Sequence, residues 1–317
     1  MGKVVQQKKT KRIYSLKSEN KRGILLFIVP VLLVYTLLFI VPMFQGVAYA
    51  FTDWDGINQN VHFVGLRNFI KIFTIDSSFL PAMGRTVFFV TLNFFGVNVL
   101  AMLFAIALTN KFKFNNIIRA AIFLPNVISM VIAGFIWQFM YLKIFPQAAE
   151  KFSILSFLNQ SWLSDSNLVM ISIVLVSMWQ GIGYIMTIYI AGLQGVDECQ
   201  IEAAKIDGAN GWQSFWKVKL PAVLPAVAVG AFMNVAGSFK IFDTVYSLTS
   251  GGPGKSSEVA MLEIYREAYL YKNFGLACAK AVLLAIVIVA ITILQMRLTS
   301  DNDKPAASKD TKEGKCK

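Results

Sequence analysis

Only a few residues in this sequence have the types and spacing that could support chemistry. Gly254, Lys255 and Ser256 end like a phosphate-binding loop, in which backbone N–H groups and a lysine hold nucleotide phosphates. That loop also requires a glycine where this sequence has Thr249. The segment is therefore interpreted as a turn, and any ATP hydrolysis linked to this protein must belong to another chain.

Metal ligands and catalytic groups are equally sparse. The sequence has one histidine, His62, and three widely separated cysteines, Cys199, Cys278 and Cys316. Their spacing matches neither a zinc site nor a disulfide framework. A membrane enzyme would need ionisable residues clustered at membrane depth, and Lys280 alone does not supply such a cluster. We therefore expect no catalytic residue, no metal and no cofactor.

The composition indicates a membrane protein. The 317 residues are 56% hydrophobic and 15% charged, with a mean hydropathy of +0.58, whereas soluble domains carry about 25% charged residues. Apolar runs long enough to cross a bilayer recur along the chain. The predicted fold is an all-α integral membrane protein with one domain, residues 23–296, and six transmembrane helices at about 24–50, 86–109, 120–142, 167–193, 221–239 and 275–296.

The basic residues predict the orientation in the membrane. The net charge is +12, and lysines and arginines concentrate in residues 1–22, 111–119, 197–220 and 297–317. The positive-inside rule then places both termini in the cytoplasm, with 1–22 as a basic arm and 297–317 as a disordered tail. Because the excess charge lies at membrane flanks, it does not indicate nucleic-acid binding.

Polar side chains inside apolar spans are costly and mark candidate solute paths. The candidates are Asn126, Ser129, Gln138, Gln180, Tyr184, Asn234, Ser238 and Asp243, together with Trp137 and Trp179. Hydrogen bonding between helices is the alternative explanation for each of them. For Lys280, extension of the side chain to the membrane surface is favoured over contact with a solute.

Residues 197–220 form a short polar elbow between two spans. Asp197 with Gln200, and Asn210 with Gln213, have the form of capping boxes, and Gly208 suits the end of a helix. Two short helices joined at residues 208–211 are therefore predicted, the second ending at Pro221. An elbow of this size cannot hold an active site but can dock onto a partner.

The elbow resembles the Glu-Ala-Ala loop of ABC importer permeases. The matching residues are Glu202, Ala203, Ala204, Gly208, Ala209, Trp212, Phe215, Leu220 and Pro221. Residues 51–54, 63–69 and 248–253 are similar to outer loops of the carbohydrate-uptake branch, the maltose and glycerol-3-phosphate type. One departure is 197–201, Asp-Glu-Cys-Gln-Ile, where that family often has Pro-x-Glu-Leu-Tyr.

The resemblance implies a permease subunit of an ATP-driven, binding-protein-dependent importer. Its partners would be a second permease subunit, two ATPase subunits, an extracytoplasmic sugar-binding protein, a carbohydrate substrate and membrane lipid. The implied ATPase-coupling residues are Glu202, Ala203, Ala204, Asp207, Gly208, Ala209, Leu220 and Pro221. The implied sugar path is drawn from Asn126, Gln138, Trp179, Gln180, Tyr184, Asn234 and Ser238. A permease for another solute, such as glycerol phosphate, or a stand-alone transporter are the alternatives.

Overall fold

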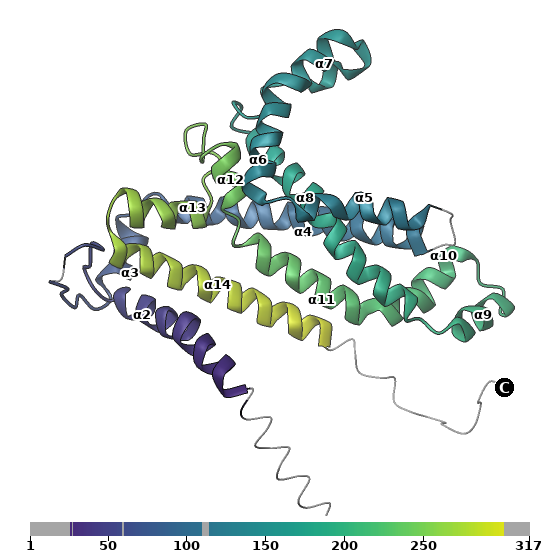
Figure 1. Ribbon diagram of the computed structural model, residues 1–317, viewed down its shortest axis with the longest axis horizontal. Helices are drawn as coiled ribbons and strands as arrows, with labels where there is room; N and C mark the ends of the chain where they lie inside the picture. The colour runs from purple at the N-terminus through teal and green to yellow at the C-terminus, as the bar shows by residue number, and fades with distance from the viewer. Residues whose placement is uncertain (1–25, 27, 59, 110–113, 301–317) are drawn as a thin grey trace, which may run out of the picture.

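All regular structure in the described part of the chain is helical. The computed structural model describes residues 26, 28–58, 60–109 and 114–300, so the predicted arm 1–22 and residues 301–317 of the predicted tail lie outside it. The α-helices are α2 Val41–Tyr49, α3 Arg67–Thr74, α4 Phe79–Thr109, α5 Asn115–Val127, α6 Met130–Phe139, α7 Phe145–Lys151, α8 Leu168–Gln194, α9 Glu198–Ile206, α10 Gly211–Ser214, α11 Leu220–Ser238, α12 Asp243–Leu248, α13 Ala260–Tyr265 and α14 Phe274–Ser300 (Figure 1). Short π-helical turns are η1 Thr36–Ile40, η2 Met140–Ile144, η4 Phe215–Lys219 and η5 Arg266–Leu270, and η3 Ser153–Leu158 is a 3-10 helix.

Five continuous helices are long and apolar enough to cross a membrane, and a bent pair raises the number to six. The continuous ones are Ile28–Tyr49, Phe79–Thr109, Leu168–Gln194, Gly211–Ser238 and Phe274–Arg297. Two helices extend beyond the predicted spans. Helix α4 begins at Phe79, before the predicted start at residue 86, and Arg85 within it donates from Nε a 2.7 Å hydrogen bond to the Glu258 carbonyl. Helix α14 continues to Ser300, so residues 297–300 of the predicted tail are helical.

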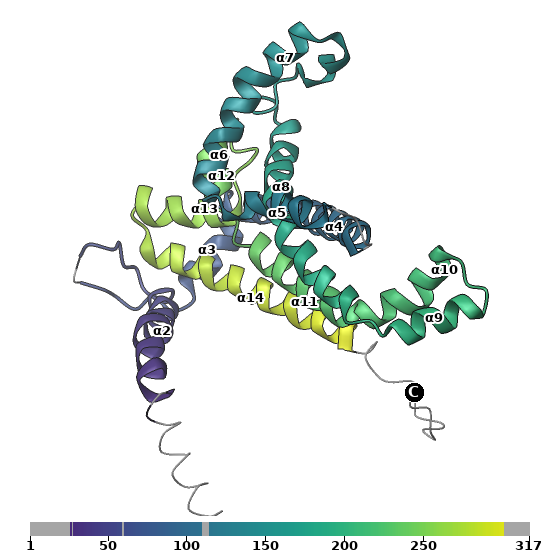
Figure 2. The same cartoon turned by 45° about the vertical axis from the view of Figure 1, so that its right-hand side comes forward.

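The third predicted span, 120–142, is not one straight helix. Helix α5 contains Pro125 and ends at Val127, and Ile128 and Ser129 have extended ψ angles of 134° and 135°. The helical segment Met130–Lys151 then leaves at 99° to α5. Proline is a common cause of such breaks, because it cannot donate the helical hydrogen bond. Figures 1 and 2 show α6 and α7 as an arm projecting from the main body.

Three of the π-helical turns lie directly before a proline. Residues Pro42, Pro146 and Pro221 each follow by two positions the last residue of η1, η2 or η4. A π-helical turn re-spaces the backbone hydrogen bonds, which accommodates the missing proline N–H without ending the helix. The prediction that Pro221 ends the second elbow helix was therefore wrong, because α10, η4 and α11 form one continuous helix, Gly211–Ser238.

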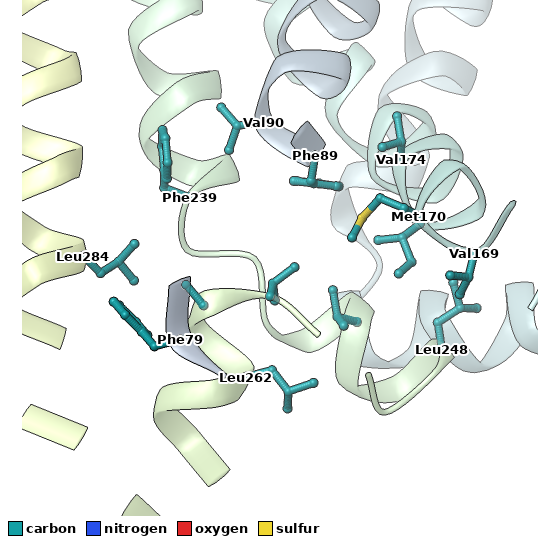
Figure 3. Packing of buried hydrophobic residues seen from close by; sticks show 14 of the residues in the cluster. Phe79, Phe89, Val90, Val169, Met170, Val174, Phe239, Leu248, Leu262 and Leu284 are labelled. Carbon is teal, nitrogen blue, oxygen red and sulfur yellow. The ribbon is translucent and has the colours of Figure 1, made fainter. Parts of the chain in front are cut away.

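The core forms where α4, α8, α11 and α14 lie side by side. Figure 3 shows Phe79 and Phe89 of α4 packing with Met170 of α8, Leu262 of α13 and Leu284 of α14. A second apolar cluster lies along α4 and α8, around Tyr189, which is fully buried. Helices α5 and α8 come very close, since a Cβ at Gly183 would lie 2.3 Å from the Ile122 carbonyl oxygen. Small residues allow this contact between membrane helices.

The two ends of the molecule differ in structure. Helices α9 and α10 lie at one end, and α3 and α13 lie at the opposite end (Figures 1 and 2). The short helix α3 lies in the connection between α2 and α4, and α13 with η5 lies in the connection before α14.

Candidate functional site

The elbow is built by local capping. The Asp197 carboxylate accepts a 2.9 Å hydrogen bond from the Cys199 N–H at the start of α9. Gly208 follows α9 with φ of +82°, a conformation that glycine adopts at no steric cost. Asn210 and Gln213 form the predicted capping box, with hydrogen bonds of 2.8 and 3.0 Å. Both predicted elbow helices therefore start where expected. Only the second has its predicted capping box, because the Asp197 carboxylate bonds to the Cys199 N–H instead of pairing reciprocally with Gln200.

The elbow displays apolar side chains on its surface. Ile206 is 86% exposed and Trp212 is 71% exposed, and the Trp212 ring packs edge-on against Trp216 with centroids 5.5 Å apart. Of the predicted coupling residues, those that line the grooves between α9 and η4 are Ala203, Ala204, Asp207, Gly208, Ala209 and Pro221. Glu202 is exposed outside these grooves, and Leu220 is half-buried at the start of α11.

A cavity of about 350 Å³, with a mainly apolar wall that also carries several polar side chains, lies between α4, α5, α8 and α11. Its lining includes five of the seven residues predicted for the path: Asn126, Gln180, Tyr184, Asn234 and Ser238. The Gln180 Nε2 donates to the Ile128 carbonyl at 3.2 Å, so it satisfies backbone at the break between α5 and α6. Irregular backbone at membrane depth is tolerated where it lines a cavity or is buried in protein. The break therefore lies beside the cavity, with the free Ile128 carbonyl hydrogen-bonded to Gln180.

The cavity also contains polar residues that the sequence interpretation missed. Asn93 donates from Nδ2 to the Ser238 Oγ at 2.9 Å, and Ser177 and Lys240 are further lining residues. Ser177, Gln180 and Tyr184 follow one face of α8 at helical spacing, which is a signal that would have identified Ser177. Within the described residues, the Asn93 Oδ1, Ser177 Oγ and Asn234 Oδ1 are buried and have no hydrogen-bond partner. Their residues line the cavity, but these three oxygen atoms are themselves enclosed by protein.

Two predicted path residues lie outside the cavity. The Gln138 Nε2 donates to the Leu248 carbonyl at 3.0 Å, which joins α6 to α12. Trp179 packs edge-on against Trp137, with centroids 5.6 Å apart. Trp179 directly precedes Gln180, and successive helical residues point about 100° apart, so the two side chains lie on different faces of α8. These contacts fit the alternative of packing and hydrogen bonding between helices.

The expectation that Lys280 extends to the membrane surface was wrong. The Lys280 side chain is fully buried, and its Nζ lies 2.6 Å from Asp76, 3.0 Å from Glu263 and 2.6 Å from Glu267. We call these four residues the Lys280 cluster. The three carboxylates are close enough together to hold a metal ion, but the lysine ammonium lies within hydrogen-bond distance of all of them. The buried Glu263 and Glu267 and the part-buried Asp76 compensate the positive charge, so the side chain has no need to reach water.

Packing in the Lys280 cluster also shifts the pKa of two of its carboxyl groups, both of which lie outside the spans. Burial, together with the neighbouring Glu258 carboxylate, raises the pKa of Glu263 despite the opposing hydrogen bond from Lys280. Burial alone would raise the pKa of Asp76, but hydrogen bonds from Lys280 and the Ser78 N–H lower it below its ordinary value. The segment that resembled a phosphate-binding loop belongs to the same region, where Lys255 donates to the Ser78 Oγ at 3.1 Å.

Membrane-spanning helices around a cavity, with an elbow at one end, define a multi-pass membrane permease. A family model described as "Binding-protein-dependent transport system inner membrane component" matches residues 97–300. The chain is 38% identical over 278 residues to "Probable starch degradation products transport system permease protein AmyD" of Thermoanaerobacterium thermosulfurigenes, covering 88% of this chain and 94% of the relative.

A second relative and a solved structure agree with this result. "Multiple sugar-binding transport system permease protein MsmF" of Streptococcus mutans is 34% identical over 273 residues, 86% of this chain and 93% of MsmF. The fold matches a chain of a bacterial ABC transporter involved in the import of the acidic polysaccharide alginate. The TM-score is 0.76 at 19% identity, over 92% of this chain and 100% of that one. The chain belongs to the family of inner-membrane components of binding-protein-dependent transport systems, which are transport subunits.

Proposed function

We propose that this permease forms part of the path for a sugar or oligosaccharide in an ATP-driven importer. The observation that carries the proposal is the cavity, whose lining includes the amide and hydroxyl side chains of Asn126, Gln180 and Tyr184. Such groups exchange hydrogen bonds with sugar hydroxyls, and a few of them in a mainly apolar wall give a pocket its selectivity. The two relatives whose names refer to sugars or starch products support the same solute class.

Glycerol phosphate is the second candidate solute, because one positively charged side chain lines the cavity. Lys240 lines the cavity and could pair with a phosphate group. The Asp243 carboxylate lines the same cavity, however, and would repel a phosphate. A neutral polyhydroxylated solute is compatible with both charges, so the sugar is preferred.

The elbow is proposed to couple transport to ATP hydrolysis. Its exposed Ile206 and Trp212 and its grooves beside Ala203 and Ala204 would receive a surface of an ATPase subunit. Helix α9, which follows α8, and α10, which is continuous with α11, would pass a rigid-body displacement to the spans that line the cavity. The proposed assembly contains this chain, a second permease subunit, two ATPase subunits and an extracytoplasmic sugar-binding protein, with residues 23–296 as one membrane domain and both termini in the cytoplasm.

The assembly is tested by purifying the tagged permease in a mild detergent and identifying the proteins that copurify. We expect an ATPase subunit and a second permease with the wild type, and loss of the ATPase alone from a variant carrying Glu202→Lys and Gly208→Pro. A Gly211→Ala variant serves as the control, because Gly211 has open space around its Cβ position and ordinary backbone angles. Recovery of this chain alone under several detergents would refute the proposed assembly.

The sugar path is tested by comparing neighbouring residues of α8. Gln180→Ala should change the preference among sugars or the receptor-stimulated ATPase rate, because Gln180 lines the cavity. Trp179→Ala should lower the amount of folded protein without changing that preference, because Trp179 packs on Trp137. The same sugar preference in Gln180→Ala and the wild type would argue against this cavity as the path.

A further inference from the structure

A second polar pocket lies apart from the proposed transport path, beside α3. It has a volume of about 360 Å³, and its lining includes Arg67, Lys71 and Thr74 of α3 with Trp54 and Asn273. The Arg67 and Lys71 side chains are one helical turn apart. Among the described residues, neither forms an ion pair with a carboxylate. The lining carries one carboxylate, Asp53, whose Oδ1 already accepts a 2.8 Å hydrogen bond from the His62 N–H. The pocket therefore has an excess of positive charge.

The pocket is fixed at the level where two spans meet the membrane surface. The Asn68 Nδ2 donates to the carbonyls of Ala50 and Thr52, at 2.9 and 2.8 Å, directly after the end of α2. On the other side, the Gly275 N–H at the start of α14 donates to the Trp54 carbonyl at 2.8 Å. Helix α3 is thus attached to the end of one span and the beginning of another, where lipid headgroups lie.

Helix α3 has the side chains of an interfacial helix. Leu66, Ile70 and Phe73 follow one stripe at helical spacing and are 62%, 59% and 60% exposed. The basic residues Arg67 and Lys71 form the adjacent stripe, which faces the pocket. An amphipathic helix with basic residues beside an exposed apolar stripe is the pattern by which proteins lie in the headgroup region of a bilayer. Tyr49 and Trp54, with ring centroids 4.3 Å apart, add the aromatic residues typical of that level.

We propose that this pocket binds the phosphate group of an anionic membrane phospholipid. Arg67 and Lys71 would donate charge-assisted hydrogen bonds to the phosphate oxygens. Leu66, Ile70 and Phe73 would lie against the acyl chains of the same leaflet. The lipid would then hold α3 against the ends of α2 and α14. This site is separate from the cavity of the proposed path, and the inference depends neither on the identity of the solute nor on the coupling role of the elbow.

The test measures lipid retained by the purified transporter that contains the full chain. The complex is placed in nanodiscs of phosphatidylcholine with a small fraction of phosphatidylglycerol, released into mild detergent and analysed by native mass spectrometry. Wild-type protein should retain phosphatidylglycerol selectively. The double variant Arg67→Gln with Lys71→Gln should lose about 30-fold in affinity, since each basic residue near an anionic surface contributes about a factor of five. If that double variant does not accumulate, the single variant Lys71→Gln should bind phosphatidylglycerol with about fivefold lower affinity than the wild type.

A matched control removes the same charge elsewhere. Lys143 and Lys151 lie in the projecting arm of η2 and α7, away from the pocket, and their double substitution by glutamine should leave lipid retention unchanged. Equal retention in the Arg67/Lys71 variant and the wild type would overturn the proposal. Displacement of the lipid by inorganic phosphate alone would show a free-anion site instead. An unchanged lipid content with weakened receptor stimulation of ATPase activity would show that this surface docks a protein.

Discussion

The elbow and the Lys280 cluster use polar residues in opposite ways. In the elbow, caps are made by residues only two or three positions away, and Ile206 and Trp212 remain exposed. In the cluster, Lys280 of α14 meets Asp76 before α4, Glu263 of α13 and Glu267 of η5, and the lysine has no exposed surface. Hydrogen bonds between residues close in sequence leave the surface of the elbow available to a partner. Ion pairs between residues far apart in sequence neutralise the charges of the cluster and hold distant segments of the chain together.

The largest expected effect comes from removing the central charge of the cluster. Lys280→Met should destabilise the folded protein by about 3–5 kcal/mol, because removing one partner of a buried ion pair leaves uncompensated buried charge. The thermal unfolding midpoint in detergent, with the amount of protein inserted in the membrane, measures this loss. Lys151→Met provides the control, since Lys151 is exposed and forms no salt bridge among the described residues. Equal midpoints for Lys280→Met and the control would mean that the cluster contributes nothing to stability.

A smaller effect is expected in the elbow. Gly208→Ala should destabilise the folded conformation of the elbow by about 1–2 kcal/mol, because a residue with a Cβ is strained at φ of +82°. The whole protein should keep its unfolding midpoint, since the elbow contributes little to the core, while transport coupled to ATP hydrolysis falls. Gly211→Ala is the matched control because both positions have open space around a Cβ and only Gly208 has a positive φ. Equal transport by the two variants would contradict a role for the closing turn.

The smallest expected effect is a pH dependence of the stability that the Lys280 cluster contributes. The pKa of Glu263 is raised by burial in the folded protein, so its protonated form is favoured there. The stability that this group contributes is therefore complete below the unfolded-state pKa of about 4.5 and is lost as the pH rises through the folded-state pKa. Unfolding midpoints of the wild type and Glu263→Gln, measured at about pH 5 and about pH 8, should shift in favour of the variant at the higher pH. A pH-independent difference between the two proteins would show that Glu263 does not titrate with the predicted linkage.

Most of the fold was predictable because spans are specified by local composition. The predicted spans 167–193 and 221–239 agree with α8 and α11 to within a residue or so. The predictions of helix extent failed where a residue far away in the sequence hydrogen-bonds to a charged or unpaired group. That contact lowers the free-energy cost of placing the group inside the fold. Arg85 ended an apolar run in the sequence, yet the Glu258 carbonyl satisfies it inside the fold. The break of α5 at Ile128 depends likewise on Gln180 of α8, which satisfies the free carbonyl.

The residues of the polar path were predictable only in part, because residue type does not show which way a helix is rotated. Residue type identified Gln180 and Trp179 as equal candidates, but rotation of α8 directs Gln180 to the cavity and Trp179 to Trp137. Asn93 satisfied the same criterion of a polar residue within a span and was overlooked. Polarity in a membrane helix therefore shows that a side chain needs a partner, without showing whether the partner is a helix or a solute.

The sequence by itself determined the membrane class, the approximate spans, and both helix starts of the elbow. These features depend on the transfer of apolar side chains into lipid and on capping groups a few residues away, so the local sequence contains all the interacting atoms. Only the tertiary structure decided that Lys280 is buried, that six candidate polar residues share one cavity, and that α3 closes a basic pocket against α2 and α14. Those outcomes depend on how helices far apart in the chain are rotated and packed, since only that packing brings their charges and hydrogen-bonding groups within reach.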